Sequence, residues 1–231
     1  MAAADDDDSV DDELALLFAD NESNKAIDAL FIVAQHDGCR WAQDCRFVKD
    51  LCRATRAETG LWSAMARVGY GRWKRTLLMY EAYIGRLDRV RWLLARGAPR
   101  DARDFWDRTA LSFASMSGHT DTVCALIVAG AGVNISDHGG RTPLDRASDR
   151  GHTDNVRALI AAGAGINVVS SYGRTPLQCA SANGYTDIVR ALIAAGAGVN
   201  IEDESGWTPL HCASMKGHTD IVRALRDAGA I

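Results

Sequence analysis

Three side chains that could do chemistry lie within one short run near the end of the chain. The run TPLHCASMKGHTDIV (residues 208–222) contains His211, Cys212 and His218. A histidine can act as the base that activates a cysteine thiol, and histidine and cysteine are both common zinc ligands. The run is therefore a candidate for a catalytic pair or for half of a metal site, and the rest of the sequence must decide whether it has a structural role instead.

The pattern of this run recurs along the chain at a fixed spacing. The stretches GRTPLDRASDRGHTDNVRALIAAGAGIN, GRTPLQCASANGYTDIVRALIAAGAGVN and GWTPLHCASMKGHTDIVRALRDAGA begin at Gly140, Gly173 and Gly206, so each starts 33 residues after the one before. Earlier copies begin at Asp107 and, more weakly, at Lys74. Five units, the last one short, therefore cover residues 74–106, 107–139, 140–172, 173–205 and 206–231.

The first part of each unit predicts a short helix. A threonine that can cap the helix is followed by a proline at the first helical position; these pairs are Thr142–Pro143, Thr175–Pro176 and Thr208–Pro209. Apolar residues one turn apart are expected to face inward; they are Leu144 and Ala147, Leu177 and Ala180, and Leu210 and Ala213. The glycines that can end this helix in the left-handed conformation are Gly151, Gly184 and Gly217.

The second part of each unit predicts another helix and a turn. The expected N-caps, each followed by an aspartate in the first turn, are Thr153, Thr186 and Thr219. The apolar stripe is formed by Val156, Leu159 and Ile160 and by Val189, Leu192 and Ile193. The glycines that stop this helix and the asparagines of the following turn are Gly163, Gly196 and Gly229, and Asn134, Asn167 and Asn200. Because such short helices are not stable alone, neighbouring units must stack.

A unit of this length with T-P-L-H, an internal glycine and a second apolar helix that ends in G-A resembles the ankyrin repeat. The resemblance covers about two thirds of the chain and implies an all-α ankyrin-repeat solenoid of helix-turn-helix units with hairpin-like turns. It also implies that His211, the histidine of T-P-L-H, makes hydrogen bonds between repeats. In the last repeat Arg226 and Asp227 replace an Ile-Ala pair, and we expect them to cap the C-terminal side of the stack.

A stacked arrangement argues against chemistry at the opening run. Adjacent residues of a helix point about 100° apart, so His211 and Cys212 do not face each other. Matching positions in neighbouring repeats, such as that of His218, are expected to lie about 8–10 Å apart, whereas zinc binds its ligands at about 2.0–2.3 Å. The chain also has no CxxC, nucleotide-binding or hydrolase motif. We therefore predict no catalytic residue, metal site, cofactor or small-molecule substrate.

The resemblance implies an extended concave face formed by the turn tips and the exposed side of each first helix. At these positions the units differ from one another, and several carry aromatic residues or arginine, the types most often found at interface hot spots. The predicted partner-binding residues are Phe105, Trp106, Arg108, Met116, His138, Arg141, Asp149, Arg150, Tyr172, Arg174, Asn183, Glu204, Trp207, Met215 and Lys216. Acidic residues beside the arginines argue against a nucleic-acid-binding stripe; they are Asp104, Asp137, Asp203 and Glu204.

The residues before the repeats fit no repeat register. Residues 1–12 contain the acidic run Asp5–Asp8 and are expected to be a disordered leader. Residues 13–72 predict four short amphipathic helices that cap the solenoid, which occupies residues 73–231. Residues 47–65 are similar to the second half of an F-box through Leu51-Cys52-Arg53 and Leu61-Trp62, although the L-P-x-E start of that motif is missing.

These features predict a non-catalytic scaffold that binds a protein partner through the concave face. No apolar run is long enough to insert into a membrane and the start of the chain has no basic flank or apolar core, so we expect an intracellular protein, cytoplasmic or nuclear. Two narrower roles remain open. The chain could be a substrate adaptor of a ubiquitin ligase that uses the F-box-like region, or an accessory structural subunit of a larger assembly.

Overall fold

The computed structural model describes residues 75–95 and 97–231. These residues form ten α-helices and no β-strand, which confirms the predicted all-α repeat solenoid. The first and second helices of the five repeats are α6 (Leu77–Ile84) and α7 (Leu87–Ala95), α8 (Ala110–Ser117) and α9 (Thr120–Val128), α10 (Pro143–Arg150) and α11 (Thr153–Ala161), α12 (Pro176–Asn183) and α13 (Thr186–Ala194), and α14 (Pro209–Met215) and α15 (Thr219–Asp227). The leader, the predicted N-terminal helices and the F-box-like stretch lie outside the described residues.

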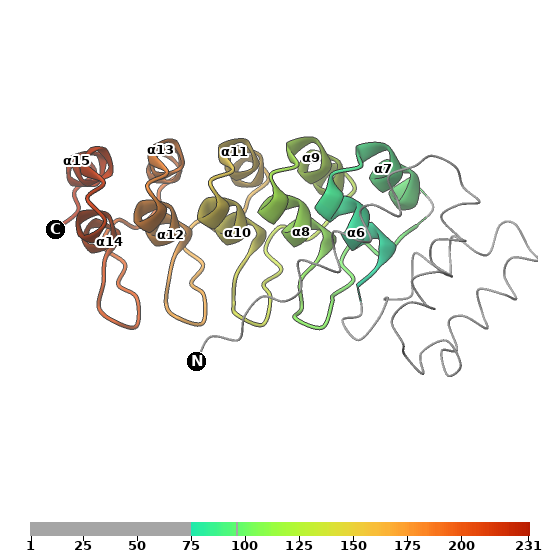
Figure 1. Ribbon diagram of the computed structural model, residues 1–231, viewed down its shortest axis with the longest axis horizontal. Helices are drawn as coiled ribbons and strands as arrows, with labels where there is room; N and C mark the ends of the chain where they lie inside the picture. The colour runs from blue at the N-terminus through green and yellow to red at the C-terminus, as the bar shows by residue number, and fades with distance from the viewer. Residues whose placement is uncertain (1–74, 96) are drawn as a thin grey trace, which may run out of the picture. The chain divides into compact units, whose positions relative to one another are not determined.

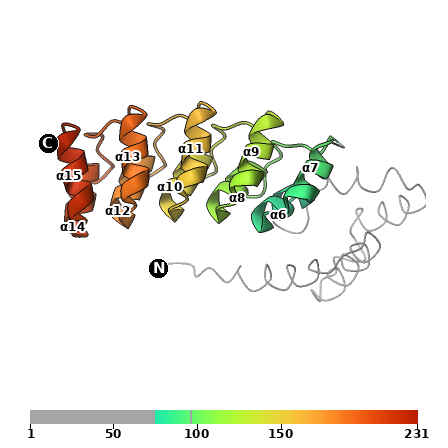
Figure 2. The same cartoon turned by 90° about the horizontal axis from the view of Figure 1, so that it is seen from above.

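The helices form two rows. Figure 1 shows the first helices side by side in one row and the second helices in another, and Figure 2 shows the repeats following one another from α6 to α15. Each first helix packs against the first helix of the next repeat and against the second helix of its own. The core therefore runs along the whole stack.

The predicted N-caps of the first helices are confirmed, and so are the C-terminal glycines of α10 and α12, whereas the C-cap of α14 is Lys216 rather than the predicted Gly217. The Oγ1 of Thr142 and of Thr175 accepts a hydrogen bond from the backbone N–H three residues later, at 3.3 and 3.2 Å. The prolines occupy the first positions of α10, α12 and α14. Gly151 and Gly184 end their helices with φ of 80° and 82°, the left-handed conformation that suits glycine.

The predicted N-caps of the second helices are wrong by one residue. α11 and α15 begin at Thr153 and Thr219, and their N-caps are His152 and His218, which make no side-chain cap hydrogen bond. Each imidazole is turned toward the preceding repeat instead. The Nε2 of His152 lies 3.0 Å from the carbonyl oxygen of Met116, so this histidine joins two repeats rather than capping its own helix.

The same histidine explains why the preceding repeat ends its first helix with glycine. Gly118 has a φ of 82°, and a Cβ added there would lie 2.7 Å from the ring of His152. Gly151 has the matching relation to Tyr185, whose ring would lie 2.6 Å from such a Cβ. The glycine is thus required both for the left-handed turn and for the close approach of the next repeat.

The leucines predicted to face inward form the centre of the stack. Leu144 and Leu177 are 0% and 1% exposed, and Val156 and Leu159 of the second helix are both 0% exposed. Leu210 is only half-buried, because among the described residues α14 packs against one neighbouring first helix, α12, whereas the inner first helices pack against two. The core prediction therefore holds for the inner repeats and is weaker for the last one.

The turn asparagines connect neighbouring repeats. The Oδ1 of Asn134 accepts a hydrogen bond from the backbone N–H of Gly165 at 2.7 Å, and Asn167 accepts one from Gly198 at 2.9 Å. Their position in a turn was predicted from their residue type, whereas this link became visible only when the repeats were placed side by side.

Three buried serines occupy one position in successive repeats. Ser115, Ser148 and Ser181 are each 0% exposed, and none of their Oγ atoms has a hydrogen-bond partner. A buried polar group without a partner costs about 1–3 kcal/mol. The first repeat has Ala82 at this position, so the packing accepts a side chain without the hydroxyl.

We therefore predict that Ser148→Ala raises the free energy of unfolding by about 1 kcal/mol, measured as a higher urea midpoint. Ser214, the exposed counterpart in the last repeat, supplies the control, and Ser214→Ala should leave the midpoint unchanged. A lower midpoint for Ser148→Ala would show that its hydroxyl is satisfied in solution.

Candidate functional site

The residues predicted to bind a partner lie on the tips of the loops that join successive repeats and at the ends of the first helices. Figure 1 shows these loops projecting beyond the row of first helices, away from the second helices. We call this surface the finger face. It comprises the loop tips 103–108, 136–141, 169–174 and 202–207 and the helix ends 116–117, 149–150, 182–183 and 215–216.

Buried aspartates hold the loop tips in shape. The Oδ1 of Asp104 accepts hydrogen bonds from the backbone N–H groups of Trp106 and Arg108, at 2.9 and 2.8 Å. Asp137 and Asp203 make the same pair of bonds in their own loops. From the sequence, these aspartates are expected only to oppose nucleic-acid binding through their charge. The structure shows that they build the loops.

The loop tips are also bonded to one another. The backbone N–H of His138 donates to the carbonyl oxygen of Trp106 at 2.9 Å, and the N–H of Glu204 donates to that of Tyr172 at 3.2 Å. Ser171 makes the equivalent bond to the loop before it. A partner therefore meets a surface whose shape is largely set in advance, which reduces the entropy lost on binding.

The arginine row predicted for partner binding is partly used within the fold. The Nε of Arg108 donates to Asp104 at 2.8 Å, and its side chain, which is 17% exposed, lies over the Trp106 ring. Arg141 pairs with Asp145 and Asp149 and is 25% exposed. The side chain of Arg174 is 52% exposed and lies 3.5 Å from Asp203. Of the three arginines, this last one is the most accessible.

The predicted binding residues thus divide into two groups. The exposed group comprises Phe105, His138, Arg150, Tyr172, Arg174, Asn183, Glu204, Trp207, Met215 and Lys216. The half-buried group comprises Trp106, Arg108, Met116, Arg141 and Asp149. Trp106 meets the ring of Phe105 edge to face at 5.5 Å and so belongs to an aromatic cluster.

Large apolar side chains stand out of the finger face in the later repeats. Tyr172 is 72% exposed, Met215 is 70% exposed and Trp207 is 41% exposed. A single exposed apolar residue is normal on a soluble protein, but several on one surface are typical of an interaction site. These three side chains are therefore accessible to a partner.

Asp145 is a buried carboxylate beneath this surface. It is 3% exposed and its Oδ2 accepts a hydrogen bond from the Nε of Arg141 at 3.1 Å. Burial raises the pKa of Asp145 above its usual value, because the loss of hydration outweighs the attraction of Arg141.

This raised pKa gives a pH dependence with a defined sign. The folded chain holds the proton of Asp145 more tightly than the unfolded chain, so its stabilising contribution is present below the unfolded pKa and is lost as the pH rises through the folded pKa. We predict that the free energy of unfolding, relative to that of Asp145→Asn, falls between about pH 3 and about pH 7, a range that brackets the usual aspartate value. Urea titrations of both proteins measure it. A relative gain over this range would mean that the ion pair dominates.

The two histidines of the run 208–222 make hydrogen-bond contacts within the fold, and its one cysteine is buried. The Nδ1 of His211 accepts a hydrogen bond from the backbone N–H of Thr208 at 3.3 Å, within one repeat. The expected bond between repeats is therefore wrong for this residue, because the hydrogen-bond partner of its ring lies in its own repeat. Gln178, at the same position one repeat earlier, does donate to the next repeat, to the carbonyl oxygen of Trp207, and also to that of Ile201 near the end of its own repeat.

The buried thiols of the last two repeats, Cys179 and Cys212, are poor nucleophiles. Burial, together with the nearby carboxylate of Asp145, raises the pKa of Cys179 to about 12. Burial also raises the pKa of Cys212, which keeps both thiols protonated at neutral pH. Among the described residues, no group of three or more His, Cys, Asp or Glu side chains is arranged to hold a metal ion.

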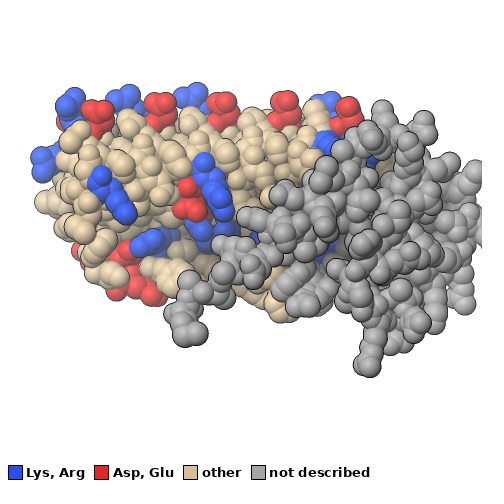
Figure 3. Space-filling model, viewed as in Figure 1, with Lys and Arg blue, Asp and Glu red and all other residues tan. Residues whose placement is uncertain are grey.

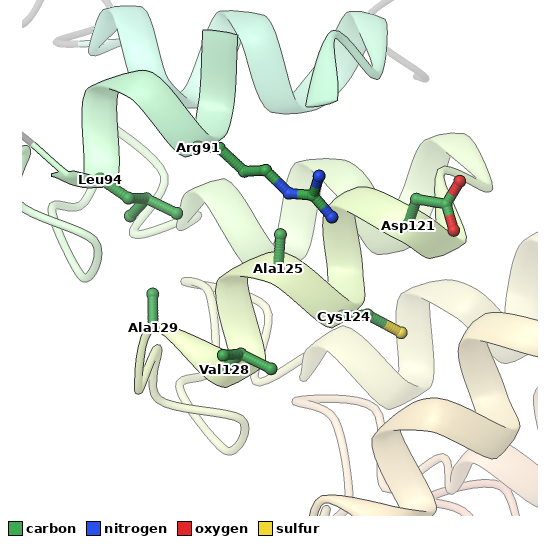
Figure 4. A pocket seen from close by; sticks show the side chains of 7 residues that line it. All are labelled: Arg91, Leu94, Asp121, Cys124, Ala125, Val128 and Ala129. Atoms are coloured by element: carbon green, nitrogen blue, oxygen red, sulfur yellow. The ribbon is translucent and has the colours of Figure 1, made fainter. Parts of the chain in front are cut away.

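A second exposed apolar surface lies on the second helices. Figure 4 shows a groove between α7 and α9 lined by Arg91, Leu94, Asp121, Cys124, Ala125, Val128 and Ala129. Val128 is 88% exposed, where the third and fourth repeats have Ala161 and Ala194. Because this groove is on the other row of helices, Val128 is a suitable control position for tests of the finger face.

No described helix has the length and apolar character that crossing a membrane would require. No curated protein matched the chain. A protein-family model described as ankyrin repeats (3 copies) matches residues 78–170 and 159–231, a span that contains α8 to α15 in full and does not reach the F-box-like stretch. The matched span covers about two thirds of the sequence and agrees with the helix pairs, the glycine turns and the stacked leucines. The chain belongs to the ankyrin-repeat family.

Proposed function

We propose that the chain is a non-catalytic scaffold that binds a protein partner through the finger face. Ankyrin repeats are protein–protein interaction modules, and proteins of this family are typically non-catalytic. The observation that supports the finger face is its composition. Tyr172, Trp207 and Met215 are exposed on a surface whose backbone is fixed by buried aspartates and by bonds between loops.

The arrangement suits recognition better than a scattered set of side chains would. Aromatic residues supply a large contact area at a low entropic cost, and they are common among hot spots. The exposed side chains lie on loop tips and helix ends of different repeats, so a partner must span several repeats to cover them. Loop tips that are already bonded to one another need little reordering when the partner binds.

Affinity capture tests this proposal. The full chain and the variant Tyr172→Ala/Trp207→Ala are used as baits in the same cell extract, with Val128→Ala as the matched control, and the captured proteins are identified by mass spectrometry. We expect one or more proteins to be captured by the unchanged chain and by the control and lost from the finger-face variant. Capture that survives in the variant and is lost in the control would place the interface on the second helices.

A further inference from the structure

We infer that the finger face recognises a short extended segment of the partner in which acidic side chains flank an apolar one. This inference rests on the proposed function and adds the chemistry of the partner. It depends on two exposed cations that form no ion pair with a described residue, Arg150 and Lys216, and on the largely uncharged surface between them.

The cations lie on both sides of α12. Arg150 ends α10, and Lys216 follows α14 at the matching position two repeats later. Both are exposed, and neither forms an ion pair with a described residue. Figure 3 shows basic atoms over the ends of α10 and α14, with uncharged surface over α12 between them. Arg174 lies on the loop side with a side chain that is 52% exposed, but its Nε is 3.5 Å from the Oδ2 of Asp203, so part of its charge is neutralised.

The surface between the cations carries one carboxylate, that of Asp149, and is otherwise uncharged and partly apolar. At the matching position α12 ends with Asn183, whose amide donates to the Asp149 carbonyl oxygen at 3.0 Å. Tyr172, on the loop before α12, and Met215, at the end of α14, are the large apolar side chains of the finger face that are each about 70% exposed. A partner residue that covers them should therefore be apolar, while its neighbours in the partner face positive charge.

Acidic groups around this surface limit where the segment can lie. Asp149 is adjacent to Arg150, but its Oδ2 is bound by Arg141 at 3.0 Å and its Oδ1 by Asn183 at 3.2 Å. Glu204 is exposed at a loop tip, and Figure 3 shows acidic atoms at the loop tips nearest α14. An acidic segment is therefore repelled from those tips and attracted to the helix ends.

The spacing of the repeats sets the length of the segment. Packed helices lie about 8–10 Å apart, so the ends of α10 and α14, two steps apart, are separated by about 16–20 Å. An extended chain advances about 3.2–3.4 Å per residue. Carboxylates about five or six residues apart therefore reach Arg150 and Lys216 together, with the apolar residue between them opposite α12. In such a contact the apolar residue supplies much of the affinity and the charges select the sequence.

Selection from a library of random twelve-residue peptides on phage tests the inference with the full chain. Selected peptides are synthesised with a fluorophore, and their dissociation constants are measured by fluorescence polarisation. Arg150→Glu/Lys216→Glu is compared with Arg157→Glu/Arg223→Glu, which makes the same change in net charge at exposed positions of the second helices. A single-stranded oligonucleotide of about 20 nucleotides serves as a second probe, since it is longer than the few nucleotides that a single binding site needs.

We expect the selected peptides to carry acidic residues on both sides of an apolar one, and Arg150→Glu/Lys216→Glu to weaken their binding at least about tenfold, since like charges in an interface repel strongly. The control pair should change binding less than about threefold, as expected for screened distant charges. Peptides without an acidic excess, equal effects of the two charge variants, or tighter binding of the oligonucleotide would each overturn the inference.

Failure of the inference and failure of the proposed function can be told apart. Selected peptides that bind through Tyr172 and Trp207, and that ignore the charge variants, would leave the finger face as the partner site and remove its preference for acids. Peptides whose binding is unchanged by Tyr172→Ala/Trp207→Ala would count against the finger face itself.

Discussion

Replacing Leu177 with alanine is expected to lower the free energy of unfolding by about 2–5 kcal/mol, the usual cost of removing a large side chain from a core. Leu177 is 1% exposed and lies in α12, which packs against both α10 and α14. The loss is a large part of a total stability of about 5–15 kcal/mol. Urea unfolding followed by circular dichroism measures it.

The last repeat supplies the control for this substitution. Leu210 occupies the matching position in α14 and is only half-buried, so Leu210→Ala removes fewer contacts and should cost less. The core assignment is wrong if Leu177→Ala has an unchanged urea midpoint, or if Leu210→Ala costs as much.

The second large effect is expected in binding. Tyr172→Ala combined with Trp207→Ala should weaken binding of the captured partner by at least about 2 kcal/mol, a hot-spot magnitude that corresponds to about a 30-fold higher dissociation constant. Tyr172 is 72% exposed and Trp207 is 41% exposed, so the urea midpoint should change little. Isothermal titration calorimetry measures the affinity.

The exposure of the side chains in the structure is the reason for substituting Tyr172 and Trp207 together. From the sequence alone, Trp106 and Trp207 would be the two residues to substitute together, because both are aromatic residues at loop tips. Trp106 is half-buried, however, and packs against Phe105 and Arg108, so removing it would mix a loss of stability with a loss of binding. Full affinity of the Tyr172→Ala/Trp207→Ala protein, or early unfolding of it, would contradict the expected result.

The features that depend only on contacts within one unit, and that recur at the same position from unit to unit, were predictable from the sequence. Thr142 and Thr175 cap first helices because a threonine oxygen can accept a backbone N–H wherever that helix starts. Leu144 and Leu177 are buried because a position that is apolar in every repeat faces the neighbouring repeat. These properties depend on local geometry and on a period of 33 residues, and both are visible in one chain.

The features that depend on contacts between units were not predictable. The ring of His152 reaches a carbonyl oxygen 36 residues earlier. Nothing near His152 in the sequence indicates this contact, and the position resembles a loop residue before a threonine cap. Asp104 and Arg108 looked like neighbouring surface charges, but the aspartate is 4% exposed and binds the arginine. Exposure of a loop side chain depends on how the loop packs, and residue type alone does not reveal it.

Hydrogen exchange of the full chain, with and without the captured partner, tests the central claim most directly, because it reports protection along the whole backbone. The account predicts slower exchange in the loop tips 136–141, 169–174 and 202–207 and at the ends of α10, α12 and α14, with no change along α9, α11 and α13. Protection confined to the second helices, with the loop tips unaffected, would contradict it.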